Sequence, residues 1–120
     1  MGENSRADDN LMAERDETYN GWANHETWCV NLWLSNDEGT YRHCRQLAAD
    51  AANAAEDSSQ VRDGVWTIEE ATRFLLADAL KEFLNELNPI ADQASVFSDL
   101  ITAALSDVDW HEIADGFLEE

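Results

Sequence analysis

Apolar residues recur along most of this 120-residue chain at spacings of three and four, the pattern of amphipathic helices. The clearest helix begins at a Thr67-Ile68-Glu69-Glu70 capping box and ends at Asn88-Pro89, because a proline disfavours helix in the residue before it. We expect its buried face to consist of Ile68, Ala71, Leu75, Ala79, Phe83 and Leu87.

Four more helices are predicted: one at about residues 24–35, one from about Asp37 or Thr40 to Ala55, one at about residues 92–105, and a short last one beginning at Asp109. Asn24 is the expected N-cap of the first, and Ser35 with Glu38 has capping-box spacing for the second. In the first helix we expect either Trp33 or Val30 to be buried as well. The other apolar side chains expected to face inward are Trp28, Leu32, Val96, Phe97, Leu100, Ile101, Leu105, Trp110, Ile113, Phe117 and Leu118.

Residues 1–18 are polar and show no sustained periodicity, so we predict a mobile, disordered acidic tail there and a helical domain over 19–120. The chain contains only one proline and five glycines, which favours helices over a sheet. A chain of this length suits one domain. The predicted fold is therefore all-α, a single-domain bundle of about five helices.

The charge balance limits the possible partners. The chain carries 26 acidic residues against 7 Lys and Arg, a net charge of −19. From Phe74 to the C-terminus there are 11 acids and a single base, Lys81. Direct nucleic-acid binding and anionic membranes are disfavoured because both require clusters of Lys and Arg. We therefore expect a cationic partner.

The acidic residues form rows on the predicted helices. Asp78, Glu82 and Glu86 are spaced i, i+4, about 6 Å apart along the helix axis, opposite the predicted apolar face. Such like charges repel by a few tenths of a kcal/mol per pair. Rigid rows of anions are what a mimic of the DNA phosphate backbone requires. The predicted partner-binding residues are Asp78, Glu82, Glu86, Asp99, Asp109, Glu112, Asp115 and Glu119.

An aromatic segment follows the tail. Its residues read YNGWANHETW over 19–28 and NLWLSNDEGTY over 31–41. This pattern resembles a small protein family of phages, plasmids and other mobile elements, over about residues 19–47. The resemblance implies a mobile-element setting, in which small acidic proteins often inhibit CRISPR or restriction, and it supplies no catalytic residues. We expect an aromatic core, of which an exposed subset could anchor a partner, formed by Tyr19, Trp22, Trp28, Trp33 and Tyr41.

Few residues of the chain indicate enzymatic activity or metal binding. A zinc site from His25, Cys29, His43 and Cys44 is conceivable, but its spacing matches no established pattern. No phosphate-binding glycine loop or metalloprotease helix occurs. We predict no enzymatic activity, no cofactor and no metal. With no apolar run long enough to cross a membrane, we expect the host cytoplasm and reduced thiols.

These features favour a DNA-mimic inhibitor that occupies the basic DNA-binding surface of a host defence complex. An anti-CRISPR protein that blocks target-DNA binding is the first hypothesis, and an anti-restriction protein is the second. The alternative is an acidic accessory or scaffold protein of a mobile element whose charge serves solubility. A small metal-binding regulator is a third possibility.

Overall fold

The structure is a computed structural model that describes residues 18–119, so the predicted tail lies outside the described residues except for Thr18. The described part folds into helices without a β-strand, and the predicted all-α fold is confirmed. The helices are α1 (His25–Asn36), α2 (Glu38–Glu56), α3 (Ser59–Arg62), α4 (Ile68–Leu87), α5 (Val96–Ser106) and α6 (Trp110–Leu118). The one-turn helix α3 lies between the predicted second helix and the one that begins at Thr67, where no helix was predicted.

Side-chain caps set the helix boundaries. The predicted capping box of α4 is present, with Thr67 Oγ1 accepting from the Glu70 N–H and the Glu70 carboxylate accepting from the Thr67 N–H. The predicted Ser35–Glu38 box is wrong, because α1 continues to Asn36 and keeps Ser35 inside it. Asp37 caps α2 instead and accepts from the Thr40 N–H at 2.9 Å. Hydrogen bonds from Thr40 lower the pKa of the Asp37 carboxyl.

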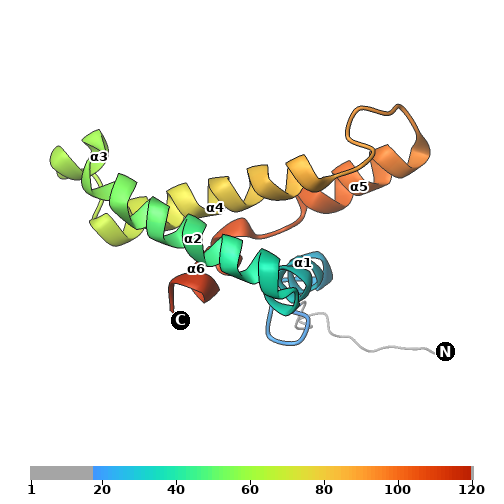
Figure 1. Ribbon diagram of the computed structural model, residues 1–120, viewed down its shortest axis with the longest axis horizontal. Coiled ribbons are helices and arrows are strands. Elements are labelled where there is room, and N and C mark those ends of the chain that lie inside the picture. The colour runs from blue at the N-terminus through green and yellow to red at the C-terminus, as the bar shows by residue number, and fades with distance from the viewer. Residues whose placement is uncertain (1–17, 120) are drawn as a thin grey trace.

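The helices pack around α4. Helix α2 packs closely against α4 because its buried face carries only small residues, Cys44 and the alanines at positions 48, 51 and 55. Helix α6 packs against both α4 and α2, and α1 contacts α2 and α6 (Figure 1). Segments from the two ends of the sequence therefore meet beside the middle of α4.

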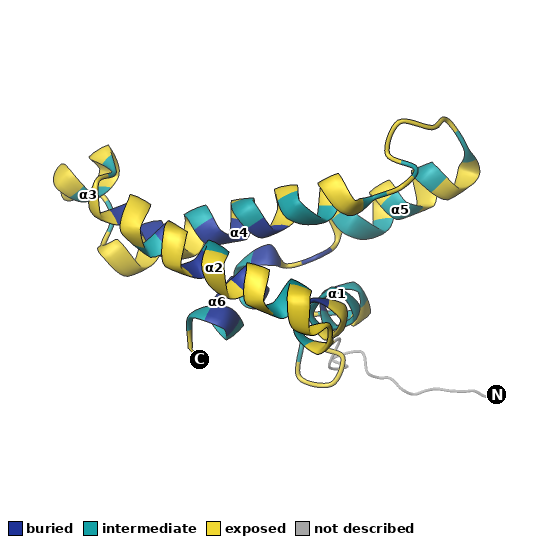
Figure 2. Ribbon diagram, in the orientation of Figure 1, coloured by how far each residue is buried: buried dark blue, intermediate teal, exposed yellow. Residues whose placement is uncertain are grey.

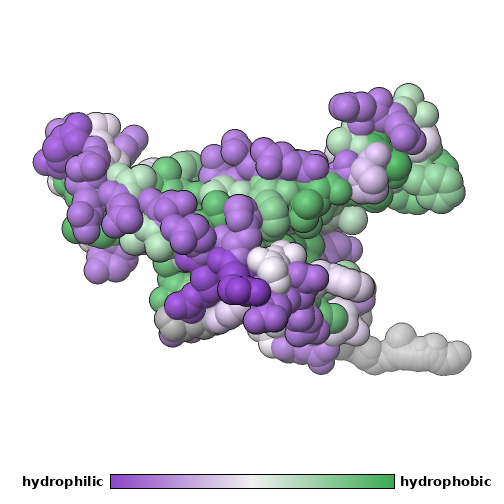
Figure 3. Space-filling view, viewed as in Figure 1, coloured by the Kyte–Doolittle hydropathy of each residue, from purple (hydrophilic) through white to green (hydrophobic). Residues whose placement is uncertain are grey.

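Helix α5 stands apart from this arrangement. It lies beside the C-terminal end of α4, where Ile101 and Leu105 approach Leu84 and Leu87, and it has no buried residue (Figure 2). Hydrophobic surface is visible over this end of the molecule (Figure 3). The α4–α5 end therefore projects from the packed centre as an arm.

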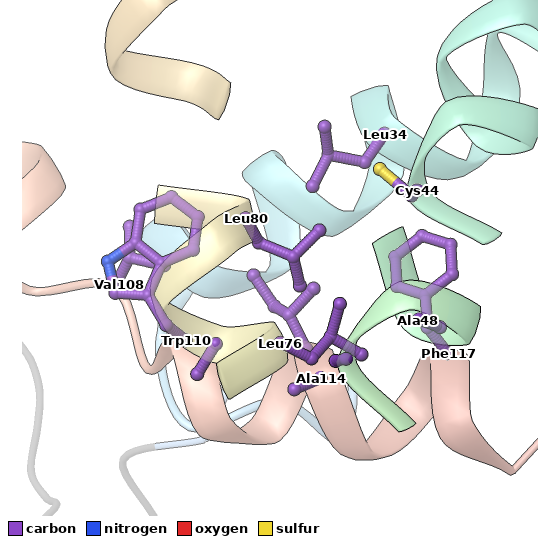
Figure 4. Packing of buried hydrophobic residues seen from close by; sticks show 12 residues of the cluster. Leu34, Cys44, Ala48, Leu76, Leu80, Val108, Trp110, Ala114 and Phe117 are labelled. Atoms are coloured by element: carbon purple, nitrogen blue, oxygen red, sulfur yellow. The ribbon is translucent and has the colours of Figure 1, made fainter. Parts of the chain in front are cut away.

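The core lies where α1, α2, α4 and α6 converge. Leu76 and Leu80 of α4 point into a cluster that includes Leu34, Cys44 and Phe117 from the other three helices (Figure 4). Leu76, Leu80 and Ile113 are completely buried. The expected burial of Trp110, Ile113 and Phe117 on α6 is confirmed.

The predicted inward faces of three helices require correction. Helix α4 is packed on two sides, so its buried residues are Ala71, Thr72, Leu76, Ala77 and Leu80, while Leu75 and Phe83 are half-buried and Ile68 and Leu87 exposed. On α1 the buried residues are Thr27 and Leu34, and on α5 there are none. Among the side chains expected inward, those found exposed are Leu32, Val96, Phe97 and Leu100.

Candidate functional site

The three acids of the predicted row on α4 share one exposed strip, which we call the α4 acidic strip: Asp78, Glu82 and Glu86. The prediction that they lie opposite Leu75 and Ala79 is wrong, because these two residues lie beside the strip. Helical geometry places the strip opposite the buried Leu76, Ala77 and Leu80 instead. Hydrophilic surface follows this outer edge of α4 (Figure 3). All three carboxylates are therefore free to meet a partner.

The acids of α6 are engaged within the protein. Asp109 caps α6 and accepts from the Glu112 N–H at 3.1 Å. Glu112 accepts from the Ala23 N–H at 2.9 Å, which attaches the N-terminal segment to α6. Asp115 lies 3.0 Å from the Arg73 guanidinium of α4. Both Glu112 and Asp115 are partly buried, so they stabilise the packing of α6 as well as adding negative charge.

The remaining predicted residues are exposed but lie on different elements. Asp99 lies in the first turn of α5, on the arm, and Glu119 follows the end of α6. A hollow of about 260 Å³ is lined by Asp78 and Asp109 together with Lys81 and His111. The fold thus brings Asp109 close to the α4 acidic strip and leaves Asp99 separate from it.

The fold also assembles an acidic hollow that the sequence reasoning missed. Glu69 and Glu70 from the first turn of α4, with Asp115 and Glu119 of the α6 end, line a hollow of about 530 Å³ around Arg73. Glu69 contributes a carboxylate to this hollow. From its position in the sequence, an acid in the first turn of a helix, we expected only a favourable interaction with the helix dipole. These carboxylates come together because the start of α4 contacts the end of α6. No local sequence pattern specifies that contact.

The aromatic segment begins with a tight turn. Tyr19 and Trp22 exchange backbone hydrogen bonds of 2.7 and 2.8 Å around Asn20 and Gly21, both with positive φ. Asn-Gly is the preferred pair for such a turn. Trp22 then packs over Gly116 of α6, where a Cβ would lie 3.7 Å from the ring. This part of the segment therefore has a structural role.

The next polar residues join α1 to the start of α6. Asn24 Oδ1 accepts from the Thr27 N–H at 2.8 Å and from the Thr27 hydroxyl at 2.6 Å, while its amide donates to the Asp107 carbonyl at 2.7 Å. The completely buried Thr27 hydroxyl in turn accepts from the Asp109 N–H at 2.8 Å. Two residues of the motif thus connect chain segments more than 80 positions apart.

Replacement of Asn24 by alanine is expected to lower the free energy of unfolding by about 1–2 kcal/mol, because it removes an N-cap and the hydrogen bond to the Asp107 carbonyl. Thr27→Val is expected to cost about 1–3 kcal/mol, since it keeps the shape but leaves the Asp109 N–H without its acceptor. Urea denaturation measures both. A cost below that of the exposed control Thr102→Val would contradict this role.

The aromatic side chains do not form one core. Tyr19, His25 and Trp28 pack together, with ring centroids 4.7–5.4 Å apart. Trp33 is 70% exposed, so the expected aromatic core is wrong at this position. Apolar residues lie around most of α1, and among the described helices α2 and α6 pack against it, which leaves Trp33 at the surface. Trp33 is thus the most exposed ring of the segment.

The cysteine and histidine side chains are dispersed. His25 packs against Tyr19 and Trp28, and His43 packs against Phe83 at 4.4 Å. Within residues 18–119, no group of three His, Cys, Asp or Glu side chains is placed to hold a metal ion. Both cysteines are free thiols, and burial raises the pKa of the Cys44 thiol to about 11.

At pH 8 a thiol of pKa about 11 is ionised about a hundredfold less than an ordinary thiol of pKa 9. We therefore expect Cys44 to react with a thiol reagent only when the protein unfolds. A Cys29→Ser variant isolates this reaction, and its rate is compared in buffer and in guanidinium chloride. A native rate equal to the unfolded rate would contradict the burial of Cys44.

None of the helices within residues 18–119 combines the length and apolarity needed to cross a bilayer. No curated protein and no solved structure shows significant similarity to this chain. A family model does match, and it spans residues 15–114, which include the aromatic segment, the α4 acidic strip and most of α6. The chain therefore belongs to DUF7249, a family of unknown function.

Proposed function

We propose that this protein is a non-catalytic DNA mimic that binds the basic DNA-binding surface of a host defence complex in the host cytoplasm. A CRISPR surveillance complex is the first candidate target and a restriction enzyme the second. The observation that carries the proposal is the α4 acidic strip, three exposed carboxylates on one rigid helix. They are about 6 Å apart along its axis, in a chain of net charge −19.

The surroundings of the strip support this proposal. Asp109 extends the negative charge toward α6, and Lys81 is the only base after Arg73 in the sequence. Among the described residues Lys81 forms no ion pair, so it reduces the negative potential locally without neutralising a particular carboxylate. Asp99 and Glu119 add to the long-range field that steers a basic partner toward the molecule.

Competition with DNA tests the proposal. A purified CRISPR surveillance complex, or a restriction enzyme, is mixed with a fluorescent target duplex and titrated with this protein. We expect the duplex to be displaced, with a half-inhibitory concentration that rises in proportion to the DNA concentration. Raising the salt from about 0.1 to 0.3 M should weaken inhibition at least about tenfold. Binding that leaves the DNA in place would contradict mimicry.

The exposed Trp33 favours the alternative, an accessory protein that binds its partner through the aromatic segment. Tryptophan is enriched among residues that dominate binding energy at interfaces, and Trp33 is 70% exposed. In that case binding would depend little on salt and would be lost in Trp33→Gln. The α4 charge variants described below would bind normally.

A further inference from the structure

A largely exposed apolar surface lies on the arm. We call it the α5 face, and it consists of Leu87, Val96, Phe97 and Leu100, which are 54–68% exposed. Soluble proteins rarely leave a contiguous group of large apolar side chains in water unless the surface binds something. The green surface over α5 in Figure 3 belongs to this end of the molecule.

Helix α5 has one broad apolar surface, only part of which faces α4. Ile101 and Leu105 face Leu84 and Leu87 of α4, and these α5 residues are half-buried. Val96, Phe97 and Leu100 continue the apolar surface around the helix from Ile101 and remain exposed. Asp99, the only charged residue of α5, lies about 100° around the helix from Leu100. A partner can therefore cover Phe97 and Leu100 without burying that carboxylate.

We propose that the α5 face pairs with the same face of a second copy of this chain, forming a two-fold symmetric dimer. The distribution of charge favours a second copy of the chain as the partner of the α5 face. Residues 87–106 contain two acids and no base, whereas the whole chain carries a net charge of −19. Two copies repel each other over most of their surface, and the α5 face is where they can approach with least repulsion. A basic partner would gain little electrostatic attraction at the α5 face.

The area of the α5 face fits a reversible dimer. The exposed parts of its four side chains amount to about 450 Å² per copy. The exposed neighbours Pro89, Ala94 and Ala103 raise this to about 600 Å². A symmetric pair would then bury about 1,200 Å² in total, the lower limit for specific interfaces. We expect a dissociation constant of about 10 µM.

Sedimentation velocity of the full chain, from about 1 to 200 µM, tests the dimer. The mass should rise from 13.5 kDa toward about 27 kDa. Higher salt should tighten the dimer, because it screens the repulsion between the copies. The variant Phe97→Gln with Leu100→Gln should raise the dissociation constant at least about a hundredfold without lowering helicity.

Trp33→Gln is the matched control, since it removes an equally exposed aromatic ring from a different helix and should leave dimerisation unchanged. The proposal is overturned if the wild-type chain stays monomeric up to about 200 µM, or if the α5 variant dimerises as well as the wild type. The inference does not depend on the proposed function. The α5 variant retains the α4 acidic strip, so failure of one proposal leaves the other testable.

Discussion

Replacement of Asp78, Glu82 and Glu86 together by lysine is expected to weaken inhibition of the target complex by at least about a hundredfold. Each substitution removes a carboxylate that would meet a basic side chain and puts a like charge in its place. Such juxtapositions cost several kcal/mol at an interface, and 1.4 kcal/mol corresponds to a tenfold change in affinity. The measurement is the DNA-competition assay described above.

The fold should tolerate this change. All three side chains are exposed and Lys is a good helix former, so circular dichroism should show unchanged helicity. Positive charges toward the C-terminal end of α4 also interact favourably with the helix dipole. A loss of helicity in this variant would mean that the strip has a structural role.

The matched control replaces Asp50, Glu56 and Asp63 by lysine. These residues are also exposed but lie outside α4. Both triple variants change the net charge from −19 to −13. If both lose inhibition equally, overall charge and not the strip is responsible, and full inhibition by the α4 variant would refute the proposed site. Glu112 and Asp115 are unsuitable for this test, because reversing them also removes the contacts with Ala23 and Arg73.

The Leu80→Ala variant is expected to lower the free energy of unfolding by about 3–5 kcal/mol. Leu80 is completely buried in the cluster where α1, α2, α4 and α6 meet (Figure 4), so truncation leaves a cavity that no single helix can close. A domain of this size is stable by about 5–15 kcal/mol, which makes this a large fraction of the total. Guanidinium chloride denaturation of dilute protein measures the loss.

Leu87→Ala is the control on the same helix. Leu87 is 54% exposed, so we expect a cost below about 1 kcal/mol. A similar loss of unfolding free energy in the two variants would mean that the α4–α5 arm is packed as well as the centre. That result would contradict the exposure of Leu87.

Local sequence signals predicted the helices well. The capping residues Asn24 and Thr67, the proline after Asn88 and the spacing of apolar residues each act within a few positions. They therefore place α1, α2, α4, α5 and α6 close to their observed ranges without tertiary information. The exposed row of Asp78, Glu82 and Glu86 followed from helical periodicity in the same way.

Which apolar side of each helix is buried depends on its neighbours, and this only the tertiary structure decided. Helix α4 is packed by α2 and α6 on two sides, which shifted its buried face to Leu76, Ala77 and Leu80. Helix α5 has apolar residues over more than half its circumference, but within residues 18–119 only α4 packs beside it, which left Phe97 exposed.

In the candidate site, too, some features follow from the sequence and others depend on the tertiary structure. The number of acidic residues and their spacing along each helix are properties of the sequence alone. Whether a carboxylate remains free depends on contacts between distant segments, as with Asp115 and Arg73 or Glu112 and Ala23. Helix periodicity carries no information about these contacts, because they form only when packing brings α6 against α4 and the start of the domain.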